Sequence, residues 1–384
     1  MDFDLSEDQR LLKDSVDRLV ADRYDFDTRR GILASPEGWS RAMWSQFAEL
    51  GLLAVPFAEE HGGIGGGPVE TMIVMEAFGR GLVVEPYLAT VILGGGLLRH
   101  AGSEAQKGEL LPRIAAGELT IALAQVERGS RYDLFDVSTT ARRDGEGYIL
   151  NGEKGVVLHG EGADTLVVTA RTAGSRRDTG GIGLFLVDAK AAGLSRRGYP
   201  TQDWMRAAEI GLENVRVGPD AVLGDPEGGL APLERVVHEG IAALAAEAVG
   251  IADEMVKVTV DYIKTRKQFG VAIGAFQALQ HRAADMVVAG EQLRSMAYYG
   301  TMMAASDDAA ERAAAMSATK VQIGRSGRFI GQQSIQLHGG VGVTMEYKIG
   351  HYFKRMTMID TAFGDADHHL ARLAERGSLF EAAA

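Results

Sequence analysis

The sequence predicts an α+β protein in which a β domain lies between two helical domains along the chain. Three observations lead to this prediction: helical periodicity in the first part, short β-rich runs separated by turn residues in the middle, and long alanine-rich helical patterns at the end. We therefore expect an N-terminal helical domain of residues 1–118, a middle antiparallel β domain of residues 119–226 and a C-terminal four-helix bundle of residues 227–384.

The composition is that of an ordinary globular protein, with 46% hydrophobic and 24% charged residues among 384. The formal net charge is −12 and no basic block is present, so general nucleic-acid binding is not expected. The count of 0 cysteines excludes disulfides, thiolate metal sites and a cysteine nucleophile. The acidic, polar start is unlike a secretory signal or a transit peptide, and the apolar run 88–98 is too short to span a bilayer, so we expect a cytoplasmic protein.

Local signals place the N-terminal helices. Ser6 and Gln9 form a capping-box pattern, which predicts a helix start because it satisfies free backbone donors. The Gly-rich segment 61–68 favours a flexible connection over a phosphate-binding loop, because no strand precedes it and no Lys-Ser/Thr pair follows. Further helical patterns cover residues 41–50, 69–79, 89–100 and 104–115.

The periodicity changes in the middle part and changes back after residue 229. Runs rich in Val, Ile, Leu and Thr indicate short strands, and Asn151-Gly152 is the dipeptide expected at a tight hairpin turn. Such regular strands, without helical spacing between them, predict a compact sandwich or barrel. The C-terminal helical patterns cover residues 230–265, 276–305, 309–337 and 347–374, of which the last holds one or two helices.

Two motifs in the C-terminal part are specific in residue type and spacing. RKQFG, at residues 266–270, lies at the turn between two long helices and is followed by Gln277; QLHGGVG, at residues 336–342, ends another helix. Together with NGEK at residues 151–154 and the helix–sheet–helix order, these motifs resemble the acyl-CoA dehydrogenase family along essentially the whole chain.

The resemblance implies a reaction, a cofactor and partners. Members of this family remove hydrogens from Cα and Cβ of an acyl-CoA thioester: a carboxylate takes the α-proton, and FAD accepts the β-hydrogen as hydride. The flavin lies within one subunit, whereas the ADP half of that FAD reaches a neighbouring subunit. The resemblance therefore implies FAD, an acyl-CoA substrate and an electron-transfer flavoprotein or a similar acceptor.

The side that the family offers to a neighbour's ADP is complete in this sequence. The resemblance assigns Arg266 to the pyrophosphate, which a planar guanidinium suits, and it assigns to Gly339 and Gly340 a close backbone approach to the phosphates. The expected FAD-binding residues are Arg266, Gln268, Phe269, Ile273, Gln277, Gln336, Gly339 and Gly340. Taken singly, a solvated arginine near a helix end and glycine helix caps also explain these residues.

The side that holds the flavin ring departs from the family pattern. The family's Thr-Glu-Pro-Gly loop is replaced by VERG at 126–129, with Tyr132 where a serine is usual, and its Trp-Ile-Thr by VVL at 156–158. Its Tyr-Glu-Gly-Thr is replaced by AFGD at 362–365, so Phe363 stands where the catalytic glutamate is expected. A phenylalanine cannot abstract a proton, and the chain is expected to hold no catalytic residue.

Other candidate bases and ligands are weaker. Some members carry the glutamate on a preceding helix, at the positions of Gly240 and Ile241 here; Glu239 is one residue away, and one helical step of about 100° points its side chain elsewhere. Asp360 and Asp365 remain open as displaced bases. His351 and the pair His368-His369 lack metal-ligand spacing, so we interpret them as solvated helix-surface residues.

These observations favour a subunit of a heteromeric acyl-CoA dehydrogenase, of α2β2 type, that lacks the base and supplies the ADP side of a catalytic partner's FAD site. The heteromeric enzymes that the chain resembles act on medium-chain dicarboxylyl-CoA or sterol side-chain CoA esters. Two alternatives stay open: a self-sufficient FAD enzyme with Asp360 or Asp365 as base, and a non-redox assembly or binding protein on the same fold.

Overall fold

The computed structural model describes residues 4–377. The chain divides into two compact units: the described parts of Met1–Arg30, Pro68–Val83 and Ile241–Ala384 form the first, and Gly31–Gly67 with Val84–Gly240 forms the second. Within residues 4–377, no helix combines the length and the apolar character needed to cross a membrane.

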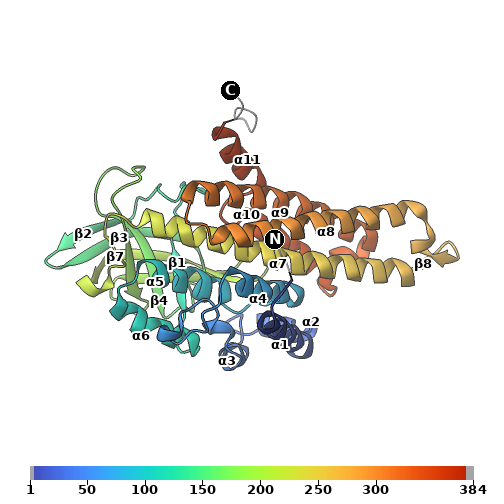
Figure 1. Ribbon diagram of the computed structural model, residues 1–384, viewed down its shortest axis with the longest axis horizontal. Helices are drawn as coiled ribbons and strands as arrows, with labels where there is room; N and C mark the ends of the chain where they lie inside the picture. The colour runs from blue at the N-terminus through green and yellow to red at the C-terminus, as the bar shows by residue number, and fades with distance from the viewer. Residues whose placement is uncertain (1–3, 378–384) are drawn as a thin grey trace. The chain divides into compact units, whose positions relative to one another are not determined.

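The first unit is helical. Long helices α8 and α9 run antiparallel side by side, and α10 and α11 pack on α9 (Figure 1). The expected capping box at Ser6 is confirmed at the start of α1. The elements are α1 (Glu7–Arg23), α2 (Phe26–Leu33), α4 (Pro68–Gly81), α7 (Leu230–Thr265), β8 (Lys267–Gln268), β9 (Val271–Ala272), η5 (Ile273–Ala275), α8 (Gln277–Ala304), α9 (Ala309–His338), η6 (Gly339–Val343), α10 (Lys348–Thr361) and α11 (Ala366–Glu375), with α2 and α7 continuing into the second unit.

Two glycines let α4 and α7 touch through their backbones. A Cβ added to Gly250 would overlap the carbonyl oxygen of Glu76, and one added to Gly79 would overlap that of Glu247. Glu247 in turn forms a buried two-point ion pair with Arg355 of α10, at 2.5 and 2.7 Å. This close contact therefore fixes both the spacing of the helices and the position of a buried charge.

The second unit carries the sheet and the remaining helices. The segment 89–100, expected as one helix, is a π-helix followed by an α-helix; its glycines permit close packing there, since a Cβ on Gly94 or Gly95 would lie 2.7 Å from Ile121 or 2.6 Å from Phe57. The helical elements are α3 (Arg41–Glu49), η1 (Leu52–Ala54), η2 (Glu59–His61), η3 (Leu88–Gly94), α5 (Gly95–Ala101), α6 (Glu104–Ala115) and η4 (Pro219–Ala221).

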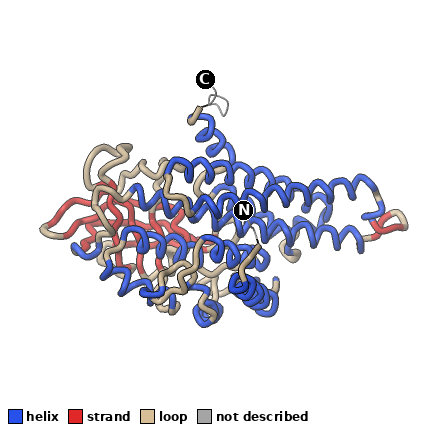
Figure 2. The backbone as a smooth tube through the Cα atoms, in the orientation of Figure 1, coloured by secondary structure: helices blue, strands red, loops and turns tan. Residues whose placement is uncertain are grey.

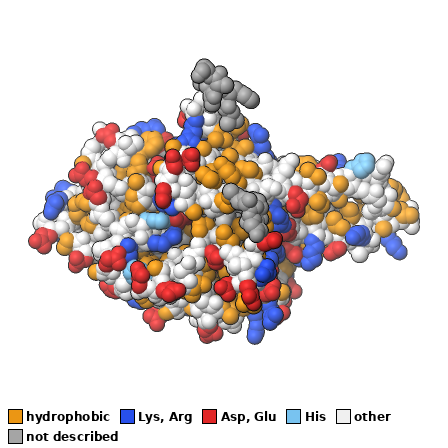
Figure 3. Space-filling model, viewed as in Figure 1, with side chains coloured by type: hydrophobic (Ala, Val, Ile, Leu, Met, Phe, Trp, Pro, Cys, Tyr) orange, Lys and Arg blue, Asp and Glu red, His pale blue; other side chains and the backbone are white. Residues whose placement is uncertain are grey.

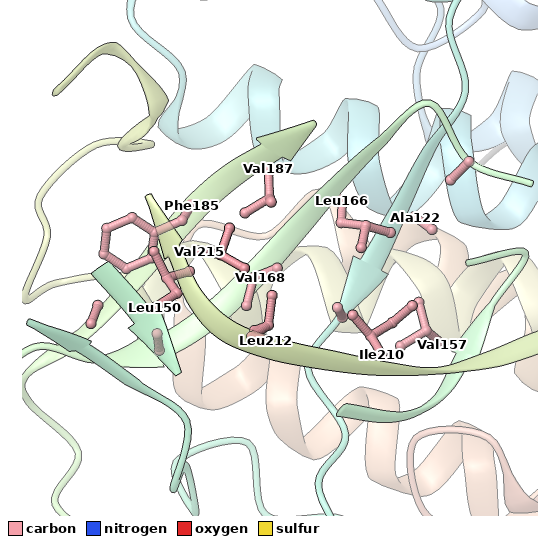
Figure 4. Packing of buried hydrophobic residues seen from close by; sticks show 14 of the residues in the cluster. Ala122, Leu150, Val157, Leu166, Val168, Phe185, Val187, Ile210, Leu212 and Val215 are labelled. Carbon is pink, nitrogen blue, oxygen red and sulfur yellow. The ribbon is translucent and has the colours of Figure 1, made fainter. Parts of the chain in front are cut away.

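Seven strands form one mixed sheet in the order β1-β4-β2-β3-β7-β6, with β5 on β4. Most pairs are antiparallel, as expected, while β1 and β2 each pair with β4 in parallel. Apolar side chains such as Leu166, Phe185 and Ile210 pack together inside (Figure 4). The strands are β1 (Ile121–Ala124), β2 (Thr140–Asp144), β3 (Gly147–Leu158), β4 (Thr165–Arg171), β5 (Ile182–Asp188), β6 (Leu194–Pro200) and β7 (Arg206–Val217).

The hairpin turn predicted at Asn151-Gly152 is wrong. Both residues lie inside β3, at a register shift against β7, and the β2–β3 turn falls at Gly145 instead, whose φ is 62°. Gly152 is needed for a close approach, because a Cβ there would lie 2.7 Å from the Cα of Thr139. Asn151 accepts a hydrogen bond from the backbone of Asn214 at 2.8 Å, so the dipeptide serves strand pairing.

We predict that Gly250→Ala destabilises the protein by about 2 kcal/mol or more, because its methyl group overlaps a helix backbone that cannot move without disturbing the bundle. The matched control is Gly290→Ala in α8, where no described heavy atom lies within 4 Å of the new methyl group. This control should gain roughly 1 kcal/mol from helix propensity. Urea unfolding of both variants measures the difference, and equal stabilities would contradict the proposed contact.

Candidate functional site

The two sequence motifs meet at one end of the bundle in the first unit. The β8–β9 hairpin, the short pair of strands at the far end of the long helices in Figure 2, joins α7 to α8. Helix α9 runs antiparallel to α8 and ends near the start of α8, where Arg282 donates to Gln333. The ring of Tyr262, in the last turn of α7, stacks on His338 with ring centroids 4.4 Å apart, and the ring centroid of Tyr347 lies 5.2 Å from that of His338. The backbone N–H of Ile273 donates to the carbonyl of Arg266, which closes the hairpin.

All eight predicted FAD-binding residues lie at this end. Ile273 is half-buried and the other seven are exposed. The guanidinium of Arg266 has no hydrogen bond or ion pair among the described residues, so its charge is available to an anion from outside the chain. Figure 3 shows hydrophobic side chains together with Lys and Arg on the end of the bundle that carries the hairpin.

Phe269 occupies an unfavourable position within the hairpin turn. Its φ is 53° and that of Gly270 is 83°, the left-handed pair that a two-residue hairpin needs and that Asn-Gly adopts far more easily than Phe-Gly. The ring is 90% exposed and touches Phe276 edge-on. A bulky, strained and exposed aromatic residue is not explained by the packing of this chain.

The glycines after α9 differ in what they are needed for. Gly339 has φ 63° and ψ −141°, which side chains rarely adopt, and a Cβ on Gly342 would lie 3.0 Å from His338. Gly340 has an ordinary φ, and no described heavy atom lies within 4 Å of the position of its Cβ. The fold therefore accounts for Gly339 and Gly342 but leaves Gly340 unexplained.

The second unit holds the loop that follows β1, and a buried ion pair organises this loop. Glu127 lies in the VERG segment and accepts hydrogen bonds from Lys154 at 2.6 Å, from the backbone of Ser138 at 2.7 Å and from that of Thr139 at 3.0 Å. Lys154 also donates to Thr169 at 2.8 Å. Burial alone would raise the pKa of Glu127, but Lys154 and these donors hold it well below its ordinary value, so both partners are charged at neutral pH.

The residues around this pair carry the sequence changes. The Gly155 N–H donates to the carbonyl of Val126, and the strand bulges so that Val156 has φ 49° and is 47% exposed. A β-branched residue with positive φ is a genuine outlier. The aliphatic Val156 offers no indole surface, and Leu158 offers no hydroxyl for the hydrogen bond that the family resemblance leads one to expect beside a flavin ring.

The turn that carries Phe363 is held firmly in the first unit. Phe363 has φ 58°, and the buried ammonium of Lys320 donates to the carbonyls of Ile359, Asp360 and Ala362 at 2.6, 2.9 and 2.8 Å. His369 donates from Nε2 to the carbonyl of Phe363 at 3.0 Å and accepts at Nδ1 from Ser317. Burial lowers the pKa of His369 to about 3, so this ring is neutral.

The carboxylates considered as alternative bases have structural partners. Asp360 is buried, accepts from Arg328 at 3.0 Å and from the backbone of Ala366 at 3.3 Å, while Asp365 caps α11 by accepting from the backbone of His368 at 2.8 Å. In the second unit, Glu239 pairs with Arg99 and, at 2.8 Å, with His100. Each of these carboxylates therefore has hydrogen-bond partners within the chain.

The interpretation of the histidines as solvated surface residues is wrong for two of them. His351 and His369 are buried, at 5% and 6% exposure, and each makes two hydrogen bonds through its ring. Their place on the same helix faces as neighbouring apolar residues was the available sequence signal. Within residues 4–377 no group of three or more His, Asp or Glu side chains is placed to hold a metal ion.

Comparison with known proteins assigns the class. Three family models match in succession: the acyl-CoA dehydrogenase N-terminal domain at residues 6–118, the middle domain at 122–215 and the C-terminal domain at 228–378. The chain is 32% identical over 326 residues to a 3-(aryl)acrylate reductase of Clostridium sporogenes, covering 82% of this chain and 84% of that protein.

Two solved structures extend the likeness to nearly the whole chain. A variant of the Tcur3481-Tcur3483 steroid ACAD superposes with a TM-score of 0.87 at 30% identity, covering 96% of this chain and 97% of that one. A chain of the ChsE4-ChsE5 complex from Mycobacterium tuberculosis gives a TM-score of 0.87 at 25% identity over 100% of both chains.

The helical, β and helical domains define a flavin-dependent dehydrogenase fold, as predicted. The chain belongs to the acyl-CoA dehydrogenase family, a family of oxidoreductases whose cofactor is FAD. The residues present fit that cofactor unevenly. Among the described residues the guanidinium of Arg266 has no partner and the Cβ position of Gly340 meets no atom, so an anionic group would find a cation and open space there. The side chains of Val156 and Phe363 offer neither a hydrogen-bonding group nor a carboxylate.

We predict that Lys154→Met destabilises the protein by about 3–5 kcal/mol, because it leaves the buried Glu127 carboxylate without its countercharge. The double variant Glu127→Gln/Lys154→Met should recover part of this loss, since it removes both charges and keeps an acceptor for the backbone donors. Chemical unfolding monitored by circular dichroism gives both values. A single variant as stable as the wild type would contradict the role of the pair.

Proposed function

We propose that this chain is the subunit of a heteromeric acyl-CoA dehydrogenase that lacks the catalytic base and supplies the ADP side of a catalytic partner's FAD site. Arg266 and Gln268 would hold the pyrophosphate, Phe269 would cover the dinucleotide, and the backbone at Gly339 and Gly340 would approach the phosphates. When bound in the partner, FAD supplies the acceptor of the substrate's β-hydride. The partner also contributes the carboxylate and the acyl-CoA pocket.

The observation that carries this proposal is the exposed end of the bundle. An arginine without a partner among the described residues, a strained phenylalanine and a glycine with open space above it lie on elements that meet there. A guanidinium and an exposed ring gain most from a ligand when water is excluded from both, which a second chain can accomplish. Each of the three features has a purpose if a phosphate-bearing ligand is brought by a partner.

The positions expected to face the flavin ring also support a subunit that holds only the ADP part of FAD. The side chains that face the flavin in the family resemblance are replaced at Val126, Val156 and Leu158, and Phe363 replaces the base. The turn that holds Phe363 is nevertheless tightly bonded, so its shape is kept without its carboxylate. Loss on one side and retention on the other favour a half-site over uniform sequence drift.

The proposed assembly is an α2β2 heterotetramer, with an electron-transfer flavoprotein or a similar protein as electron acceptor. The likeness to the small subunit of pimeloyl-CoA dehydrogenase belongs to this proposal. It points to acyl-CoA esters from dicarboxylate or fatty-acid degradation, and the similar steroid ACAD leaves sterol side-chain CoA esters as the other class. The similar ChsE4-ChsE5 complex supports a heteromeric assembly. A cytoplasmic location is part of the same proposal.

We predict that the chain expressed alone carries little FAD and has no acyl-CoA dehydrogenase activity. Loss of a catalytic base alone typically costs roughly 10²–10⁴-fold in rate. Phe363→Glu should not restore turnover, because the changed side chains beside the flavin and Ile241 remain. Visible flavin absorbance and a dye-coupled assay with acyl-CoA test both statements. A yellow, active homo-oligomer would instead favour the self-sufficient enzyme with Asp360 or Asp365 as base.

In the complex co-purified with its catalytic partner, Arg266→Ala should weaken FAD retention by roughly one to two decades. A charge-assisted hydrogen bond is worth about 1.5–3 kcal/mol. Arg266→Lys should recover only part of this, because an ammonium cannot reproduce the planar two-point geometry. The measurement is the flavin content of the assembled complex after serial dilution.

Two further variants control this experiment. Arg128→Ala, in the exposed part of the altered loop, should leave FAD retention unchanged. Gly340→Ala should leave the stability of the chain unchanged, since its Cβ meets no described atom, yet lower FAD retention by obstructing the phosphates. If Arg266→Ala and Gly340→Ala both retain FAD as the wild type does, the proposed ADP site is wrong. A complex that holds no FAD at all would favour the non-redox assembly protein.

A further inference from the structure

The segment between α9 and α10, residues 339–347, is here called the glycine loop. It contains Gly339 and Gly340, which the proposed function places against the phosphates of FAD. Its first part is the short 3₁₀-helix η6, and the backbone and the hydroxyl of Thr344 both donate to the carbonyl of Val341, at 3.2 and 2.9 Å. Beyond Thr344 the shape of the loop depends on what holds residues 345–347.

His351, in the first turns of α10, holds the distal part of the loop. Its Nε2 lies 3.0 Å from the carbonyl oxygen of Met345, and its Nδ1 lies 3.3 Å from Nη1 of Arg29. A carbonyl only accepts and a guanidinium only donates. Nε2 must therefore carry the proton and Nδ1 must offer its lone pair, and the neutral Nε2–H tautomer is the single form that satisfies both contacts.

Arg29 fixes this tautomer from the opposite side. Its side chain is 2% exposed, and its Nε donates to the carbonyl of Leu82 at 2.8 Å, a residue whose own φ is 53°. The ring of Phe26 packs edge-on against the imidazole, with centroids 4.9 Å apart. The ring of His351 is thus enclosed by α2 on one face and bonded to the glycine loop at its edge.

The charged groups that face His351 are cations. Burial lowers its pKa, the hydrogen bond to Met345 acts in the opposite direction, and Arg29, Lys354 and Arg30 lower the pKa further. Arg29 and Arg30 come from α2 and Lys354 from α10, and the loop contributes the Met345 carbonyl. Protonation would place a second cation against Arg29 and destroy the acceptor that Arg29 uses.

We propose that His351 is the positioning residue of the glycine loop: its neutral imidazole, oriented by Arg29, holds the Met345 carbonyl and so keeps the loop in the shape that receives the ADP part of FAD. The identity of the ligand, FAD, rests on the proposed function. The role of His351 in holding the loop does not. It predicts that acid loosens this end of the bundle. Because the folded-state pKa lies below the unfolded value of about 6.5, the hold is complete above that pH and is lost as pH falls below it.

Two substitutions separate the bonds of His351. The amide nitrogen of His351→Gln can replace Nε2 and donate to Met345, and this side chain does not titrate. His351→Asn is shorter: its oxygen can replace Nδ1 and accept from Arg29, but its amide does not reach Met345. The first variant keeps the bond to the loop, and the second keeps only the bond to Arg29.

The test is hydrogen–deuterium exchange of the full chain, corrected for intrinsic exchange rates. At pH 7.5 we expect amides of residues 341–347 to exchange roughly tenfold faster in His351→Asn, as for one lost buried hydrogen bond, with His351→Gln close to the wild type. Between pH 7.5 and 5.5 the wild-type loop should lose protection relative to His351→Gln. If His351→Asn does not fold, the acid dependence of the wild type compared with His351→Gln still tests whether His351 holds the loop.

The co-purified complex links the loop to FAD. His351→Asn should lose FAD roughly tenfold more readily than His351→Gln, measured beside Arg266→Ala. An unchanged loop in His351→Asn, or no acid difference between the wild type and Gln, overturns the inference. A loosened loop with normal FAD retention, while Arg266→Ala loses FAD, also overturns it and leaves the proposed function standing. Normal FAD retention in every variant overturns the proposed function and with it the ligand assigned to the loop.

Discussion

The β domain depends on one buried ion pair, Glu127–Lys154, whose two charged groups are shielded from water and satisfied by neighbouring donors and acceptors. The pair ties the loop after β1 to β3 and β4, three segments that are separate in sequence. Removing either partner alone would leave a buried charge, which is far more costly than changing a surface side chain. The side chain of Val156 beside the pair is exposed and takes no part in these bonds, so the network does not restrict the residue type there.

The turn between α10 and α11 is also held by buried side chains that bond to its backbone. Lys320 saturates all three of its donors on carbonyls at the C-terminus of α10, where a cation is also favoured by the helix dipole. His369 fixes the carbonyl of Phe363 itself. Lys320 and His369 thus hold a turn whose central side chain, Phe363, is a hydrocarbon ring, so the shape of the turn does not depend on that side chain.

Periodicity and motif spacing predicted most of the fold, because the long amphipathic patterns of α7, α8 and α9 have few alternatives. They failed where backbone contacts decide the structure: Asn151-Gly152 has the composition of a turn, but Gly152 serves the close approach of Thr139 within a strand. They also failed at His351 and His369: the apolar helix faces gave a signal of burial, but the hydrogen-bond partners Arg29 and Ser317 are distant in sequence and could not be predicted. The motifs also predicted that the eight expected residues would lie close together, and the structure places them at one end of the bundle, while their binding of FAD stays a prediction. The stacking contacts of Tyr262 and Tyr347 with His338 could not be predicted from the sequence.

At the exposed end of the bundle, two residues adopt arrangements that contacts within this chain do not stabilise. A phenylalanine held with a positive φ and 90% in water costs free energy twice, once through its backbone and once through its hydration. Arg266 beside it gains little from water-exposed pairing, since such contacts contribute at most about 1 kcal/mol. Both costs are offset only if another molecule covers the ring and brings an anion to the guanidinium. An exposed end with these properties is what the proposed half-site subunit requires.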